Sequence, residues 1–101
     1  MAYLAEFKEG VQGGWFEVGT ITVDPPSIAA GATANVDITV SGAAVGDVIF
    51  VMPPSDLEGD LKVLGASVVA ANTVRIGLKN EGSVAVDGVS KEWGYLLFHK
   101  A

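Results

Sequence analysis

The sequence contains no cysteine, and this absence excludes two chemistries that depend on its sulfur. Neither a disulfide framework nor a zinc site built from thiolates can form. The N-terminus also lacks the uninterrupted apolar stretch of a secretory signal, because Glu6, Lys8 and Glu9 fall where that stretch would lie. We therefore expect a protein that is made and folds in a cytoplasm.

Long apolar runs and basic clusters are missing as well. The longest strongly apolar run, Val48 to Met52, is far too short to span a bilayer, so no membrane partner is expected. Twelve acidic residues stand against six basic ones, and no stretch combines lysine and arginine with interleaved aromatics. A net charge of −6 repels phosphates at long range, so nucleic acid is not expected as a partner either.

Residues that could carry catalysis or hold a cofactor are sparse. His99 is the only histidine, and so near the C-terminus we interpret it as an exposed strand-end residue instead of a member of a catalytic triad. Asp56, Glu58 and Asp60 place carboxylates on alternate residues, but no glycine or glutamate follows where an EF-hand calcium loop requires it. The glycine-rich stretch 10–14 matches no dinucleotide fingerprint and is interpreted as a hinge. The prediction is no enzyme activity, no metal and no cofactor.

The chain does contain short runs with strand character, separated by residues that favour turns. In most of them apolar and polar residues alternate, which is typical of half-buried strands. The runs are Phe16–Val23, Ala34–Val40, Val48–Met52, Leu61–Ala71, Val74–Leu78, Val84–Val86 and Trp93–Phe98. The Asn72-Thr73 break predicts a hairpin, and no segment has a sustained helical period. This pattern predicts an all-β fold: a single small β-sandwich, Ig-like or jelly-roll-like, of about six or seven strands.

The same alternation assigns a core. The residues expected to point inward are Val36, Ile38, Val40, Val74, Ile76 and Leu78, with Ile49 and either Val51 or Phe50 packing between them. Because Val48–Met52 is apolar at every position, it is predicted to be a central strand that is buried on both faces. Trp93 and Tyr95, with Trp15, are expected to serve as core or interface anchors; the alternative is an aromatic platform that binds sugars.

The first fifteen residues differ from the rest and predict a division into an N-terminal arm, residues 1–15, and a sandwich domain, residues 16–101. This segment is either an ordered arm or a frayed terminus. Large apolar side chains are more frequent here than in a solvated tail, which points to packing on a neighbouring subunit. The predicted oligomer or capsid interface consists of Tyr3, Leu4, Phe7, Trp15 and Phe16.

A series of turn and strand motifs carries a resemblance to a known family. The motifs are, in order, Asp24–Thr33, Gly42–Asp47, Val68–Val74, Leu78–Gly82, Ala85–Asp87 and Trp93–Tyr95. Their order is similar to that in a family of small β-sandwich proteins common among tailed-phage and prophage structural genes. The resemblance covers Ile21 to Phe98, and its motifs specify a fold more closely than a role.

The resemblance implies a virion structural protein: a decoration or cement protein on the outer capsid surface, made in the host cytoplasm. Its expected partners are the major capsid protein and further copies of itself, arranged as a trimer. The alternative is an Ig-like or carbohydrate-binding module used in host attachment, because the piece Pro26–Thr33 also occurs in bacterial Ig-like adhesion modules.

Overall fold

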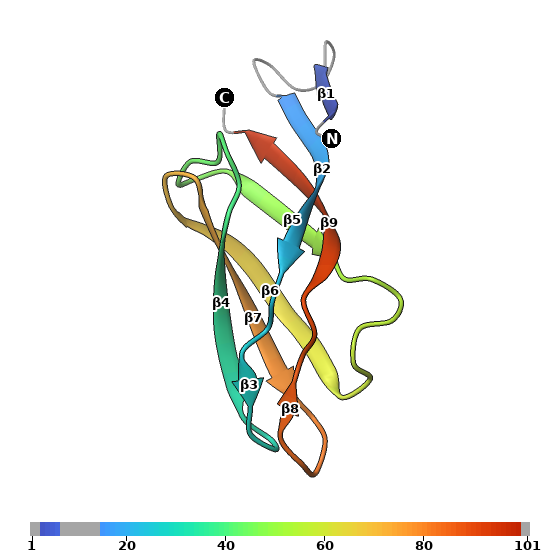
Figure 1. Ribbon diagram of the computed structural model, residues 1–101. Coiled ribbons are helices and arrows are strands. Elements are labelled where there is room, and N and C mark those ends of the chain that lie inside the picture. The colour runs from blue at the N-terminus through green and yellow to red at the C-terminus, as the bar shows by residue number, and fades with distance from the viewer. Residues whose placement is uncertain (1–2, 7–14, 100–101) are drawn as a thin grey trace.

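The computed structural model describes residues 3–6 and 15–99, which form nine β-strands and no helix (Figure 1). The strands are β1 (Tyr3–Glu6), β2 (Trp15–Val23), β3 (Ser27–Ile28), β4 (Thr33–Thr39), β5 (Val48–Met52), β6 (Leu61–Ala70), β7 (Thr73–Asn80), β8 (Val86–Asp87) and β9 (Lys91–His99). Every pairing between them is antiparallel. The all-β prediction is therefore confirmed.

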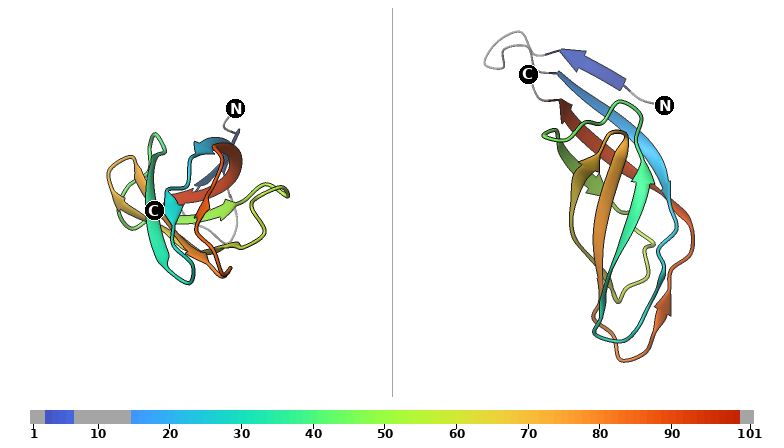
Figure 2. Two further views of the ribbon diagram at one scale, coloured as in Figure 1. Left: turned by 60° about the horizontal axis from the view of Figure 1, so that its bottom comes forward. Right: turned by 90° about the vertical axis from the view of Figure 1, so that its left-hand side faces the viewer.

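The strands form two layers that face each other (Figure 2). One layer is a four-stranded sheet in the order β1-β2-β9-β5, and the other is a three-stranded sheet in the order β4-β7-β6. The short pair β3-β8 lies at one end of the molecule, below the two sheets in Figure 1. This arrangement is a small β-sandwich, as predicted, with two more strands than the upper expectation because β1 and the two-residue β3 have no readable alternation.

The core lies between the two sheets and follows the predicted alternation. From β7, Val74, Ile76 and Leu78 are completely buried, and from β9, Trp93 and Leu97 are too. The other buried apolar residues are Val23, Ile28, Ile38, Val40, Ala43, Ile49, Leu61, Val68 and Tyr95, with Val36 and Val51 packed half-buried against them. Trp93 and Tyr95 are core residues, so the sugar platform proposed for them is excluded.

The predicted hairpin at Asn72 is present between β6 and β7. Asn72 has a positive φ of 61°, a conformation that asparagine tolerates better than most residues. Its side-chain oxygen accepts a hydrogen bond from the backbone N–H of Gly42 at 2.8 Å, and its own N–H donates to the carbonyl of Ala43. The hairpin therefore also holds the loop that leads into β5.

The prediction that Val48–Met52 is a central strand is wrong. This segment, β5, is an edge strand that pairs only with β9. Ile49 is buried against the core, whereas Val48, Phe50 and Met52 on the opposite side are 52%, 56% and 47% exposed. A run that is apolar at every position predicts that both faces are covered, but this chain covers only one of them within the residues described.

The N-terminal segment is described only in part. Residues 3–6 form β1, which pairs with β2 so that Tyr3 lies opposite Val18 and Glu6 opposite Trp15. The described part of the predicted arm therefore extends the four-stranded sheet as its edge strand. Phe7 lies outside the described residues. The predicted strand at Val84–Val86 is displaced, since β8 spans Val86–Asp87.

Candidate functional site: an apolar sheet face

The outward-facing side of the four-stranded sheet carries a second set of apolar residues. On β2, β9 and β5 the side chains that do not point into the core are mostly large and apolar, because these strands are apolar in both alternating phases. We call this surface the apolar face. It consists of Phe16, Val18, Val48, Phe50, Met52, Leu96 and Phe98.

Strand register arranges these residues in rows across the sheet. Phe98 lies between Phe16 and Val48, and Leu96 lies between Val18 and Phe50. In a third row, Gly94 lies between Thr20 and Met52. Of these nine positions none is charged, and Thr20 alone is polar.

Aromatic contacts connect the three strands along the first two rows. The ring centroids of Phe16 and Phe98 are 5.6 Å apart, and those of Phe50 and Phe98 are 6.3 Å apart with the rings nearly perpendicular. Both distances fall in the range of favourable aromatic pairs. Four members of the face, Val18, Val48, Phe50 and Met52, are nevertheless exposed to solvent. A contiguous exposed apolar surface of this kind is typical of a protein interaction site.

The outer side of the three-stranded sheet has the opposite character. On β7 it carries Arg75, Gly77 and Lys79, and on β4 it carries Asn35 and Asp37. Arg75 donates two hydrogen bonds to the carboxylate of Asp37, from Nε to Oδ1 at 2.8 Å and from Nη2 to Oδ2 at 3.0 Å. These bonds lower the pKa of the Asp37 carboxyl and raise the pKa of the Arg75 guanidinium.

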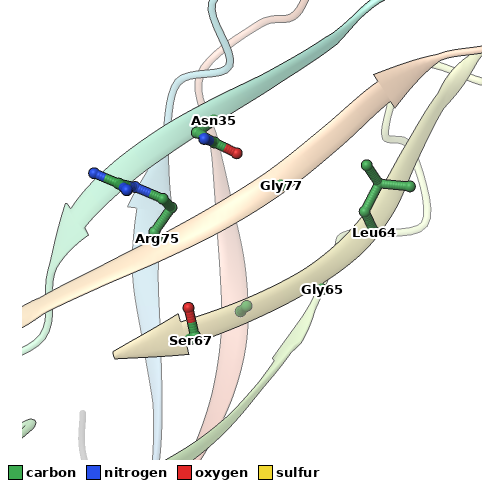
Figure 3. Close-up of a pocket in the computed structure, with 7 residues that line it drawn as sticks. Asn35, Leu64, Gly65, Ser67, Arg75 and Gly77 are labelled. Atoms are coloured by element: carbon green, nitrogen blue, oxygen red, sulfur yellow. The ribbon is translucent and has the colours of Figure 1, made fainter. Parts of the chain in front are cut away.

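A shallow, open hollow lies on this polar side (Figure 3). Its lining residues are Asn35, Leu64, Gly65, Ala66, Ser67, Arg75 and Gly77. Gly65 and Gly77 pair across β6 and β7, and because neither has a side chain the surface is hollow at this point. Leu64, next to them, is the residue at the bulge in β6. The hollow offers the amide of Asn35 and the hydroxyl of Ser67 to a small polar ligand, and Arg75 lies at its margin with two of its N–H groups bonded to Asp37.

The interpretation of His99 as an exposed residue is wrong. Its side chain is only 8% exposed and lies between two carboxylates, with Nδ1 3.1 Å from Oδ2 of Asp47 and Nε2 3.4 Å from Oε1 of Glu17. The backbone N–H of Ala44 also donates to Oδ2 of Asp47. This cluster ties β2 and β9 to the turn before β5, and so it supports the sheet from beneath the apolar face.

Of the three acidic residues between β5 and β6, Glu58 uses its carboxylate in contacts within the fold. Oε2 of Glu58 accepts a hydrogen bond from the N–H of Val89 at 2.9 Å and lies 3.4 Å from Nζ of Lys91. The bond from Val89, with the nearby ammonium group, lowers the pKa of Glu58. Lys91 also donates to the carbonyl of Asp56. Within residues 3–6 and 15–99, no histidine or carboxylate cluster is arranged to hold a metal ion.

Four of the five predicted interface residues lie on β1 and β2 of the same sheet, and the fifth, Phe7, lies outside the described residues. Phe16 belongs to the apolar face. The backbones of Tyr3 and Leu4 pair with Val18 and Glu17, and that of Trp15 pairs with His99. The sequence analysis missed the contributions of β5 and β9, although the two apolar phases of Trp93–Phe98 and the uninterrupted run at Val48–Met52 were readable signals.

No protein-family model matches the chain, and no curated protein or solved structure matches it either. In the part of the chain that the structure describes, no helix has the length and apolar character needed to cross a membrane. Inferences about function therefore depend on the surfaces of the sandwich itself.

Proposed function

We propose that this protein is a phage virion structural protein, a capsid decoration protein that binds the outer surface of the shell and stabilises it. The observation that carries the proposal is the uncharged apolar face on a rigid sandwich. Such a face is suited to contacts between protein subunits. The resemblance of the turn and strand motifs to those of phage structural proteins supports the more specific part of the proposal, the capsid and its major protein as the setting of those contacts.

A decoration protein of this kind acts by mass action. A subunit that binds the assembled shell, but not its separated parts, stabilises the shell by its binding free energy. The sandwich suits this role because its strands fix the surface residues in place before binding, which limits the entropy lost on association. The net charge of −6 keeps unbound copies soluble and away from packaged DNA.

The test is heat resistance of particles with and without the protein. Particles of a phage whose gene for this protein has been deleted are heated with a dye that reports released DNA. Purified protein is added to a second sample of the same particles before heating. We expect release at a lower temperature without the protein and recovery of the original temperature when it is restored. Unchanged heat resistance in both samples would contradict the proposal.

A carbohydrate-binding module for host attachment is the second candidate, and the polar hollow on the three-stranded sheet favours it. Asn35, Ser67 and Arg75 present hydrogen-bonding groups beside the exposed side chain of Leu64, which is a combination that a sugar ring can use. Loss of host adsorption from protein-free particles, with normal heat resistance, would favour this candidate. Glycan binding that an Asn35→Ala variant abolishes would locate the site.

A further inference from the structure

We propose that a second copy of this chain packs on the apolar face, sheet against sheet, so that the protein is a twofold-symmetric dimer. The proposal rests on the proposed function only in treating this face as a contact between protein subunits. It differs from the trimer expected from the sequence, because a single flat surface that contacts its own counterpart closes after two copies.

The central strand β9 is apolar on both sides. Trp93, Tyr95 and Leu97 point into the core, while Leu96 and Phe98 belong to the apolar face. Sheets whose strands are apolar in both phases are normally covered on both faces. The three-stranded sheet covers the inner side (Figure 2), and the described chain places no second layer over the outer side.

The size of the surface also fits a second copy. The four strands have nine, nine, five and four residues, and at about 3.3 Å per residue and about 4.8 Å between strands they give a sheet face of about 430 Å² in plan. A standard interface buries about 800 Å² of accessible surface on each partner, and side-chain relief makes accessible area larger than plan area. One sheet face therefore supplies about half of that area in plan and approaches it once side-chain relief is counted, with the apolar rows as its core.

Charge favours the same contact. Each copy carries −6, so two copies associate only if the contact keeps their acidic groups apart. The apolar face lies on the half of the sheet away from β3-β8 (Figure 1). Glu92 is exposed on the outer side of β9, one row beyond Gly94 and so at the margin of the face. The exposed acidic residues on β8 and in the segments next to β3 and β8 are Asp24, Asp60, Glu81 and Asp87. Packing through an uncharged centre leaves these groups at the far ends of the dimer.

The exposure of the apolar face in a free copy favours a second copy over the shell as its occupant. A face reserved for the shell would stay exposed in every free copy until a capsid is met, and exposed apolar sheet surface leads to aggregation. A self-complementary face is covered as soon as two copies meet. The dimer would then present its remaining surfaces to the shell in pairs, which strengthens binding through avidity.

Sedimentation equilibrium of the purified full-length chain at micromolar concentration tests the proposal. We expect the mass of a dimer for the native sequence and half that mass for Phe50→Glu, which places a charge in the centre of the contact. Leu64→Glu is the matched control, because Leu64 is equally exposed, at 60%, but lies on the polar side; this variant should remain a dimer. A monomeric or trimeric native protein, or a dimeric Phe50→Glu variant, would overturn the proposal.

A cross-linking experiment keeps the test valid if Phe50→Glu does not fold. The chain has no cysteine, so single variants Val18→Cys and Leu64→Cys each carry one thiol. A short bismaleimide should link two copies of Val18→Cys and leave Leu64→Cys unlinked. Equal cross-linking of both variants, or of neither, contradicts the proposal.

The outcomes also separate this inference from the proposed function. A dimer that fails to raise the heat resistance of capsids would leave the inference intact and remove the proposed function. A monomer that protects capsids, and loses this effect on Phe50→Glu substitution, would show that the shell covers the face; the proposed function would then stand without the dimer.

Discussion

The two outer surfaces of this sandwich are made by the same kind of strand and differ almost completely in chemistry. On β4 and β7 the outward residues are polar or charged, as in Asp37 and Arg75. On β5 and β9 they are apolar, as in Phe50 and Leu96. Both sheets contribute large apolar side chains to the core from their inner sides, such as Trp93 and Ile76, and packing of that core does not require apolar residues on the outer side of β5 and β9. The difference is the basis for the proposal that the outer residues of β5 and β9 contact another protein subunit.

If the inner sides of both sheets contribute to one shared core, replacing a large core residue by a small one in either sheet should destabilise the whole domain. Trp93 in the four-stranded sheet and Ile76 in the three-stranded sheet are both completely buried. We expect Trp93→Ala to lower the free energy of unfolding by about 3–5 kcal/mol and Ile76→Ala by about 2–5 kcal/mol. Urea denaturation measures both values. A loss below about 1 kcal/mol at either site would mean that the two sheets do not share one core.

A smaller loss of stability is expected at Gly19, on the inner side of β2, where the ring of Tyr95 packs closely against the backbone. A methyl group at Gly19 would lie 2.9 Å from both Cε2 and the hydroxyl oxygen of Tyr95, which is closer than atoms approach without a shift. Gly19→Ala should therefore cost about 1–3 kcal/mol in thermal or urea unfolding, through displacement of the Tyr95 ring. Gly59→Ala is the control, since nothing lies within 4 Å of its added carbon. Equal stability of the two variants would refute the tight contact.

The acid dependence of stability should show a contribution from Glu58, at the side of the four-stranded sheet. Its pKa is lowered in the folded chain, chiefly by the N–H of Val89. The carboxylate therefore stabilises the fold above its unfolded pKa, and this stabilisation is lost as the pH falls through the folded pKa. Glu58→Gln should lower stability by about 1 kcal/mol or less at neutral pH.

The pH profile of unfolding supplies the check on this prediction. The difference between the native protein and Glu58→Gln should shrink as the pH is taken below the ordinary range of glutamate. A difference that stays constant, or grows, in acid would exclude the hydrogen bond as its cause.

The smallest effect is expected on the polar outer surface. Arg75 and Asp37 are both close to half exposed, so water and salt screen their attraction. Replacing Arg75 by Gln should leave the thermal midpoint and the oligomeric mass almost unchanged. A marked fall in either would show that this side of the sandwich also carries a contact, and the contrast between the two faces would no longer hold.

The parts of the fold that sequence analysis predicted correctly are those in which a local period reports the environment. Val74, Ile76 and Leu78 alternate with polar residues, and their buried side follows from that pattern alone. Val48–Met52 has no alternation of this kind, because it is apolar at every position. A strand that is buried on both faces by its own chain and a strand whose outer face is exposed in the single chain can therefore have the same sequence pattern. His99 could not be placed either, since Glu17 and Asp47 are distant in sequence and meet it only when β2 and β9 pair.

Asn80 illustrates a further limit. Its position after an alternating run suggests the start of a loop, yet it is completely buried. Its Nδ2 donates to the carbonyls of Ile28 and Val84 at 2.9 and 2.7 Å, and its Oδ1 accepts from the N–H of Gly82 at 2.8 Å. Buried asparagines are tolerated only when such bonds are complete. Gly82 and Val84 belong to the loop that follows Asn80, but Ile28 belongs to β3, and no local pattern reveals that distant partner.

The central place of β9 has a consequence for the order in which the molecule is built. A ribosome completes β4, β6 and β7 while β9 is still unmade, so the three-stranded sheet is able to form from neighbouring segments first. The four-stranded sheet must wait, because β9 separates β2 from β5 and pairs Trp15 with His99 across nearly the whole described chain. Pairings between such distant segments are slow to form. The three rows of the apolar face come together only at this last step, and an unfinished chain therefore has no such surface with which to recruit a partner.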